Sequence, residues 1–266
     1  MDTSIEYQSF RSDGVEIAFV DVPPEDTQPR GTVLLIHGFA SNIQANWVDT
    51  SWFRTLGREG YRVVACDVRG HGRSAKLYDE TLYGARIFAE DARRLLDHLE
   101  IPTAHVIGYS MGARITAFLA MTHAARVASA TFGGLGANMV IGLPGARAIA
   151  HAFLADSLDE VTHPTARSFR EFAEATGSDL KALAHCILSA RAKISREMVA
   201  GIEVPVLVAV GTNDPIGGPA EDLALMIPGA VAAPLEGLDH MKAVGARAFK
   251  DAAVTFLATH TPAANS

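Results

Sequence analysis

The residues with the clearest chemical meaning lie at positions 108–112, where the sequence reads GYSMG. An apolar run at 104–107 precedes them, and a segment with helical periodicity follows. This is a Gly-x-Ser-x-Gly pattern in the context that it requires, because the chain must pass from a strand directly into a helix and so lifts the central side chain clear of the sheet. A serine hydroxyl held in this way can attack a carbonyl carbon. The pattern predicts Ser110 as a nucleophile.

A serine hydroxyl is a weak nucleophile unless a base accepts its proton, and the base needs a carboxylate to orient it. Both groups occur in the last third of the chain. Asp214 follows an apolar run at 206–210, and His240 follows a second short run at 230–235. Groups at the carboxyl ends of parallel strands collect at one edge of an open α/β sheet. The order Ser110, Asp214, His240 is the order of serine triads on such sheets, and we predict this triad.

Asp239 is a second carboxylate beside the expected base. Neighbouring side chains leave the backbone in different directions, so Asp239 reaches the ring of His240 only awkwardly. Asp214 arrives from a neighbouring strand end. We therefore expect Asp214, and not Asp239, to orient the base.

The charge that develops on a carbonyl oxygen during acyl transfer needs two N–H donors. One comes from the residue after the nucleophile and the other from a loop after an earlier strand. Met111 takes the first position, and the sequence HGF at 37–39, directly after an apolar run, takes the second. We predict an oxyanion hole formed by the backbone N–H groups of Phe39 and Met111. His37 is expected to have a structural role in its loop.

The elements that must position these residues alternate along the chain. Continuous apolar runs of the kind found in buried parallel strands occur at 15–20, 32–36, 62–66, 104–107, 127–132, 204–210 and 230–235. Helical periodicity occurs between them, at 82–99, 111–121 and 246–257. This alternation predicts an α/β sheet flanked by helices. Residues 12–14 carry a turn signal that predicts a hairpin between strands at 5–10 and 15–20.

The stretch 137–201 breaks the alternation, because it contains no convincing strand and has helical periodicity at 145–155, 165–175 and 179–190. We expect a helical cap here, inserted into a core domain formed by 1–136 and 202–266. Apolar side chains in or near the insertion are expected to line a substrate pocket; these are Met139, Leu143, Phe153 and Met241, with Ile141, Leu154 and Phe169 as further candidates.

The bulk composition excludes several classes of function. The 266 residues are 48% hydrophobic and 20% charged, which is close to ordinary globular composition. A net charge of −7 offers no basic surface to a nucleic acid or an anionic membrane. The first residues lack a basic and then apolar signal pattern, and no segment approaches the roughly 18 apolar residues of a membrane span. We therefore expect a cytoplasmic protein with no membrane span and no nucleic-acid partner.

Motifs for bound metals and nucleotides are also missing from the sequence. The two cysteines, Cys66 and Cys186, are far apart and form no Cys-x-x-Cys pair, so neither a disulfide framework nor a zinc site is indicated. The sequence GLG at 134–136 lacks the last glycine of a dinucleotide fingerprint, and neither a phosphate-binding loop motif nor His-Glu-x-x-His occurs. These observations argue against dinucleotide, nucleotide and zinc-protease chemistry.

Five short stretches, in this order and spacing, resemble the α/β-hydrolase superfamily: HGF at 37–39, DVRGHGRS at 67–74, GYSMG at 108–112, GTNDP at 211–215 and GLDHM at 237–241. The resemblance covers nearly the whole chain. It implies an eight-stranded, mostly parallel sheet and no cofactor or metal. It also implies structural roles for Asp67 and His71 in the loop that braces the active-site edge.

Within this family, a nucleophilic aspartate is typical of dehalogenases and epoxide hydrolases, whereas Ser110 favours hydrolysis of an ester, thioester, lactone or carbon–carbon bond. The single glycine of the HGF loop resembles that of esterases and lipases. We expect a carboxylesterase that cleaves a small-molecule ester through an acyl-enzyme.

The sequence is also compatible with two other functions. One is a carbon–carbon bond hydrolase acting on ring-cleavage products, whose carboxylate would need a cation such as Arg114, Arg147 or Arg191. The other is a small-molecule receptor that keeps the fold and has negligible turnover.

Overall fold

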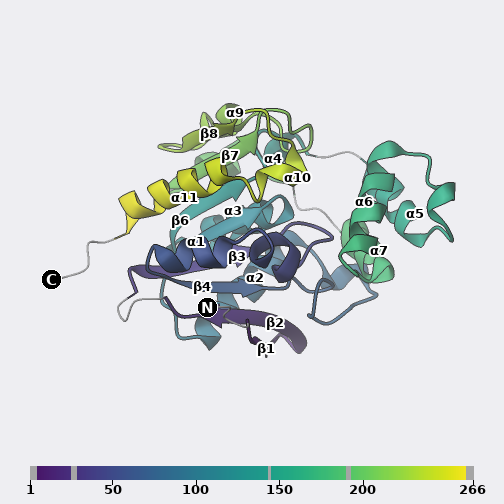
Figure 1. Cartoon of the computed structure of the whole chain (residues 1–266), viewed down its shortest axis with the longest axis horizontal. Coiled ribbons are helices and arrows are strands. Elements are labelled where there is room, and N and C mark those ends of the chain that lie inside the picture. The colour runs from purple at the N-terminus through teal and green to yellow at the C-terminus, as the bar shows by residue number, and fades with distance from the viewer. Residues whose placement is uncertain (1–4, 25–28, 143–144, 190–192, 262–266) are drawn as a thin grey trace.

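The computed structural model describes residues 5–24, 29–142, 145–189 and 193–261. Its centre is an eight-stranded sheet with the spatial order β1-β2-β4-β3-β5-β6-β7-β8 (Figure 1). The strands are β1 (Tyr7–Ser12), β2 (Val15–Val22), β3 (Gly31–Ile36), β4 (Tyr61–Cys66), β5 (Ala104–Tyr109), β6 (Val127–Gly133), β7 (Val206–Gly211) and β8 (Val231–Leu235). Strands β3 to β8 pair in parallel, and β2 pairs antiparallel with both β1 and β4. The predicted α/β fold with a mostly parallel sheet is confirmed.

The antiparallel edge is a tight hairpin. Ser12 pairs with Val15, so two residues form the loop, and both have positive φ: 52° at Asp13 and 78° at Gly14. A two-residue turn of this kind matches the right-handed twist of the flanking strands. Because the turn needs only these two residues, β1 continues to Ser12, further than the sequence pattern predicts.

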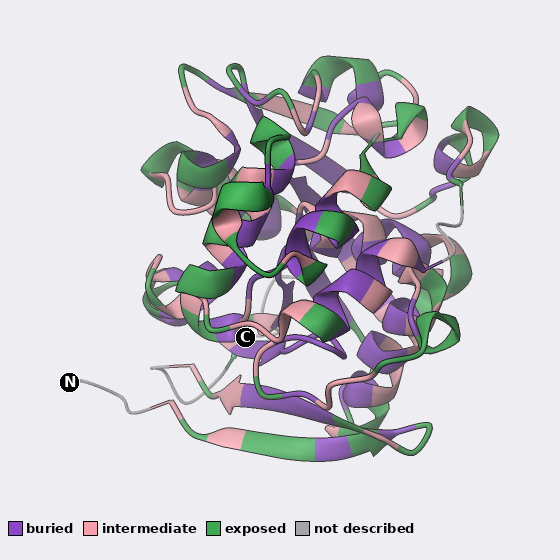
Figure 2. Ribbon diagram, turned by 90° about the vertical axis from the view of Figure 1, so that its right-hand side faces the viewer, coloured by how far each residue is buried: buried purple, intermediate pink, exposed green. Residues whose placement is uncertain are grey.

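Helices cover both faces of the sheet, and each face has its own hydrophobic cluster. On one face pack α2 (Ala85–His98), α3 (Met111–Thr122), α8 (Arg196–Ala200) and α9 (Ala220–Ala224). On the other face pack α1 (Trp52–Arg58) and α11 (Arg247–His260). Neighbouring strand residues such as Leu34 and Leu35 belong to opposite clusters, as the alternation of side chains along a strand requires. Figure 2 shows the result, with buried strands inside and exposed outer faces on the helices and on β1.

Between β6 and β7 the chain is helical. It forms α4 (Asn138–Ile141), α5 (Ala146–Leu154), α6 (Pro164–Ala175), α7 (Leu180–Leu188) and α8. Met139 of α4 and Val199 of α8 belong to the hydrophobic cluster that α2 and α3 share on one face of the sheet. Helices α5, α6 and α7 instead share a third cluster, which includes Ala40 of the core, and lie to one side of the sheet (Figure 1). We call α5 to α7 the cap helices below.

Short helices complete the chain: the π-helix η1 (Gln44–Val48), the 3₁₀ turns η2 (Glu80–Leu82), η3 (Ala124–Arg126) and η4 (Leu158–Glu160), and the α-helical turn α10 (His240–Ala243). None of the helices in the described ranges is long and apolar enough to cross a bilayer. Cys66 and Cys186 are both buried and form no disulfide bond with each other.

Candidate active site

Ser110 lies at the junction of β5 and α3, in strained backbone geometry. Its φ of 54° and ψ of −110° are values that a non-glycine residue rarely adopts. The flanking glycines make the junction possible. A Cβ at Gly108 would lie 2.1 Å from the carbonyl oxygen of Gly112, and a Cβ at Gly112 would lie 1.9 Å from that of Ile36. The chain at the β5–α3 junction therefore packs more closely than a Cβ at either glycine would allow. This tight turn places the Ser110 side chain at the edge of the sheet.

Ser110, His240 and Asp214 come together from three separate segments of the chain, after β5, β8 and β7 respectively. The Ser110 Oγ is 3.0 Å from His240 Nε2, and His240 Nδ1 is 2.7 Å from Asp214 Oδ2. The other carboxylate oxygen of Asp214 accepts the backbone N–H groups of Ile216, at 2.8 Å, and Gly217, at 2.9 Å. These bonds fix the carboxylate, so it holds the His240 ring with Nε2 facing the serine.

Asp239 has a different position. Its Oδ1 accepts the N–H groups of Met241 and Lys242, so its side chain caps the first turn of α10. These hydrogen bonds, together with the nearby Lys242 ammonium, lower the pKa of the Asp239 carboxyl. The carboxylate at His240 Nδ1 belongs to Asp214.

The main chain of His240 is also held. The Tyr109 hydroxyl donates to the His240 carbonyl oxygen at 2.5 Å, and the two rings are in contact. Tyr109 directly precedes the nucleophile and is buried, so one residue links the serine turn to the histidine loop. The sequence does not predict this contact, because its only signal is an aromatic residue inside the GYSMG pattern.

The Gly38–Phe39 loop lies beside Ser110. The Gly38 N–H donates to Asn46 Oδ1 at 3.0 Å, and a Cβ at Gly38 would lie 3.5 Å from Ser110 Cβ. No acceptor for the Phe39 N–H occurs among the described residues. At the other side of the serine, Met111 opens α3, where the first N–H groups have no partner within the helix. Both predicted oxyanion donors therefore belong to segments that flank Ser110.

Asn46 is a site residue that the sequence analysis missed. It lies in the π-helix η1 and is 5% exposed, and its Nδ2 has no hydrogen-bond partner in the described structure. Because the Gly38 N–H needs an acceptor, the orientation of the amide is fixed with Oδ1 toward Gly38. π-Helical turns often mark functional sites, but their sequence signal is too weak to read in advance.

His37, Asp67 and His71 brace the loops behind the site. The His37 ring bonds the Gly38 carbonyl oxygen and accepts the Val68 N–H, at 2.7 and 2.9 Å. Asp67 accepts the N–H groups of Ile43 and Arg73. Burial lowers the pKa of both histidines, to about 3 for His71, so neither ring is charged at neutral pH. These contacts fit the structural roles expected from the sequence.

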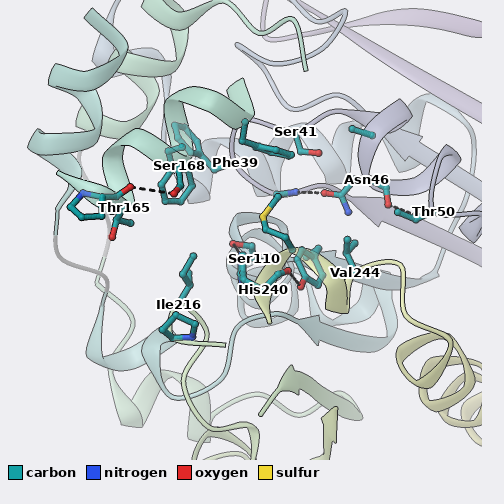
Figure 3. Close-up of a pocket in the computed structure, with 18 residues that line it drawn as sticks. Phe39, Ser41, Asn46, Thr50, Ser110, Thr165, Ser168, Ile216, His240 and Val244 are labelled. Atoms are coloured by element: carbon teal, nitrogen blue, oxygen red, sulfur yellow. Dashed lines mark hydrogen bonds between the residues drawn. The ribbon is translucent and has the colours of Figure 1, made fainter. Parts of the chain in front are cut away.

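Ser110 and His240 open onto a pocket of about 510 Å³ (Figure 3). One wall comes from α6 and includes Thr165, Ser168 and Phe169, while the opposite wall includes Asn46 and Thr50. Further lining residues are Phe39, Phe172, Pro215, Ile216, Met241 and Val244. Among the described residues that line the pocket, none is an aspartate, glutamate, lysine or arginine. The pocket is therefore mainly apolar, with hydroxyl and amide groups at its walls.

Only some of the expected pocket residues lie here. Met241 and Phe169 line the pocket. Met139 is instead fully buried in the hydrophobic cluster of the core. Phe153 is buried between cap helices and reaches the site only through its contact with the Phe39 ring. Ile141 and Leu154 do not line the pocket and are 75% and 57% exposed. Leu143 lies outside the described residues.

Of the three arginines considered as carboxylate ligands, the two in the described ranges, Arg114 and Arg147, do not line the pocket. The Arg114 guanidinium donates to the Met139 carbonyl oxygen at 3.0 Å, and Arg147 is exposed on α5. Arg191 lies outside the described residues. Within the described ranges, no group of three or more His, Cys, Asp or Glu side chains is placed to hold a metal ion.

Comparison with known proteins supports one family. The family model described as "alpha/beta hydrolase fold" matches residues 31–145, which include Ser110 and the Phe39 loop. The chain is 37% identical over 136 residues to epoxide hydrolase B of Mycobacterium tuberculosis, a match that covers 48% of this chain and 35% of that protein. It is 32% identical over 171 residues to 3-oxoadipate enol-lactonase 1 of Acinetobacter baylyi, covering 59% of this chain and 62% of that protein.

The fold itself is shared over almost the full length of solved structures. A thermophilic esterase from Thermogutta terrifontis has a TM-score of 0.75 at 20% identity, covering 96% of this chain and 99% of that one. The curated relatives differ in the reactions that their names describe, and this chain spans only 35% and 62% of their lengths.

Proposed function

The chain belongs to the α/β-hydrolase superfamily, and on that premise we propose that it is a serine hydrolase that cleaves carboxylic esters through an acyl-enzyme. The observation that carries the proposal is the continuous hydrogen-bonded series from Ser110 Oγ through His240 to Asp214, with separations of 3.0 and 2.7 Å. This series ends in an apolar pocket large enough for a small ester.

In the proposed reaction, Ser110 Oγ attacks the ester carbonyl carbon while its proton moves to His240 Nε2. The carboxylate of Asp214 stabilises the imidazolium that forms. The N–H groups of Phe39 and Met111 stabilise the negative oxygen of the tetrahedral intermediate. Collapse breaks the bond to the alcohol, which leaves with the proton from Nε2. Water then attacks the acyl-serine with His240 as base, and the acid is released.

The nucleophile argues against epoxide opening, although one relative is named an epoxide hydrolase. A carboxylate that opens an epoxide forms an ester, which water can hydrolyse. A serine would instead form an ether, which has no carbonyl carbon for water to attack and would block turnover. Ser110 therefore supports substrates that contain a carbonyl group.

The pocket favours neutral esters over the carboxylate-bearing products of ring cleavage. Binding a carboxylate in an apolar site requires a cation or several N–H donors. No lysine or arginine belongs to the described lining, and Arg114 is bonded to a backbone carbonyl outside it. This composition supports the ester over the carbon–carbon bond as the scissile group.

A panel of p-nitrophenyl esters of increasing acyl length, run beside a ring-cleavage product, tests the proposal. We expect turnover of the esters with a burst equal to the enzyme concentration when deacylation is slow. Faster cleavage of the ring-cleavage product would favour the carbon–carbon hydrolase. No turnover and no burst with any ester would favour a receptor.

A further inference from the structure

The segment between α6 and α7 touches the loop that carries Phe39. Thr176 is the C-cap of α6, and its hydroxyl lies 2.8 Å from the Ala40 carbonyl oxygen and 3.1 Å from that of Ala173. Its single proton is donated to the nearer oxygen, that of Ala40. The Ser178 hydroxyl lies 2.9 Å from the Thr176 hydroxyl and 3.4 Å from the same carbonyl. From the other side, the Asn42 amide reaches the Thr176 carbonyl oxygen at 3.5 Å. The cap helices are therefore hydrogen-bonded to the residues directly after Phe39.

The carbonyl at Ala40 belongs to a strained residue. Ala40 is fully buried and has a φ of 59°, in the left-handed region that residues with a Cβ avoid. Such a conformation persists only when its surroundings hold it. A turn from Gly38 O to Ser41 N–H, at 3.2 Å, holds one side, and the Thr176 hydroxyl holds the carbonyl itself. Without that donor the chain after Phe39 can relax toward an ordinary φ.

Relaxation at Ala40 would rotate the preceding peptide groups, including the Phe39 N–H. The Phe39 ring lies between His71 of the core and Phe153 and Phe169 of the cap helices, with ring centres 5.6 to 5.9 Å apart. Its side chain can therefore follow the cap helices when they shift. On the core side, Asn46 holds only Gly38, one residue before Phe39.

Resting on the proposed function, we propose that Thr176 is a positioning residue of the oxyanion hole, by which the seated cap helices fix the Phe39 N–H. Helices α6 and α7 lie between the sheet and α5 (Figure 1). When they are packed against the core, the Thr176 hydroxyl reaches the Ala40 carbonyl and the oxyanion hole is complete. Removing one oxyanion donor lowers kcat by about 10²–10³ in serine hydrolysis, so partial misplacement should cost less.

The test uses Thr176→Val, alone and together with Ser178→Ala, so that no hydroxyl reaches the Ala40 carbonyl. We expect the double variant to lower kcat for p-nitrophenyl butyrate at least about tenfold with little change in KM, since the donor acts mainly in the transition state. Affinity for a trifluoromethyl ketone, which forms a tetrahedral adduct, should fall in parallel. Thr176→Ser, which keeps the hydroxyl, should stay within about twofold of wild type.

Tyr78→Phe is the matched control. Its hydroxyl donates to Asp179, the N-cap of α7, at 2.8 Å, so its removal also loosens the cap helices but leaves the bond to Ala40 in place. We expect kcat of this variant within about twofold of wild type. Equal losses of kcat in Tyr78→Phe and the Thr176 variants would reduce Thr176 to a general structural role and overturn the inference. If the double variant does not fold, kcat of Thr176→Val alone tests the inference, and a value within about twofold of wild type would overturn it.

Ser110→Ala separates the two proposals. If it is inactive while the Thr176 variants match wild type, the positioning role is wrong and the serine hydrolase proposal stands. If it retains wild-type turnover, the proposed function fails and the positioning role fails with it.

Discussion

Backbone contacts hold each group of the Ser110 site, so the side chains have little freedom to leave their positions. Ser110 is fixed by the turn between two glycines that tolerate no Cβ. Two N–H donors hold Asp214, and the Tyr109 hydroxyl holds the main chain of His240. Preorganisation of this kind lowers the cost of reaching the transition state.

The two carboxylates near His240 give a sharp comparison at the residue scale. Asp214→Asn keeps the shape of the side chain but favours the wrong tautomer of His240, so we expect kcat to fall by ~10³–10⁴ with folding intact. Asp239→Asn keeps an oxygen that can cap α10 and removes only the negative charge beside Lys242, so it should lower kcat about tenfold or less. The measurement is kcat of both purified variants on one activated ester, with circular dichroism as the folding control. The reverse ranking would make Asp239 the triad acid.

At the scale of elements, the site residues that follow strands were predictable and those that depend on the cap helices were not. Strand ends of a parallel sheet meet at one edge, so Asp214 and His240 could be placed together from the order of apolar runs. The rotation of each cap helix depends on its contacts with the core. Periodicity alone therefore could not separate Phe169, which lines the pocket, from Phe153, which packs between helices.

The α6 wall should determine which acyl chains fit. Phe169→Ala opens the pocket beside Phe39, so we expect the ratio of kcat/KM for octanoate over acetate esters to rise about tenfold, as one or two well-placed methylenes would allow. Leu154→Ala on α5 is the control, because Leu154 is exposed and does not line the pocket. An unchanged ratio in Phe169→Ala, or an equal change in Leu154→Ala, would place the acyl chain elsewhere.

At the scale of the whole molecule, histidines are buried near the carboxyl ends of the parallel strands and also near their amino ends. His71 lies near the active-site edge. His105, at the start of β5, bonds Ser129 and Thr261 at 2.8 and 3.2 Å and so connects the sheet to the end of α11. Burial, with a smaller effect of nearby His260, lowers the pKa of His105 to about 4. The folded protein therefore resists protonation of this ring.

This depressed pKa makes folding sensitive to acid. Above about pH 6.5, His105 is neutral in both the folded and unfolded states and contributes no pH dependence. As the pH falls from about 6.5 toward 4, the unfolded state binds a proton that the folded state excludes, so the free energy of unfolding decreases by on the order of 2–3 kcal/mol. Urea unfolding at pH 7 and pH 4.5 should show a smaller loss in His105→Gln than in wild type. Equal losses in both proteins would contradict a neutral buried His105.

Covalent labelling with a fluorophosphonate tests whether Ser110 is the activated nucleophile of the proposed serine hydrolase. A base and an oxyanion hole must both act on the hydroxyl for rapid attack on phosphorus, so we expect one adduct per chain, located on Ser110 by peptide mass spectrometry. Ser110→Ala should take up no label, and Asp239→Asn should label like wild type. A label on another serine, or undiminished labelling of Ser110→Ala, would show that Ser110 is not the activated nucleophile.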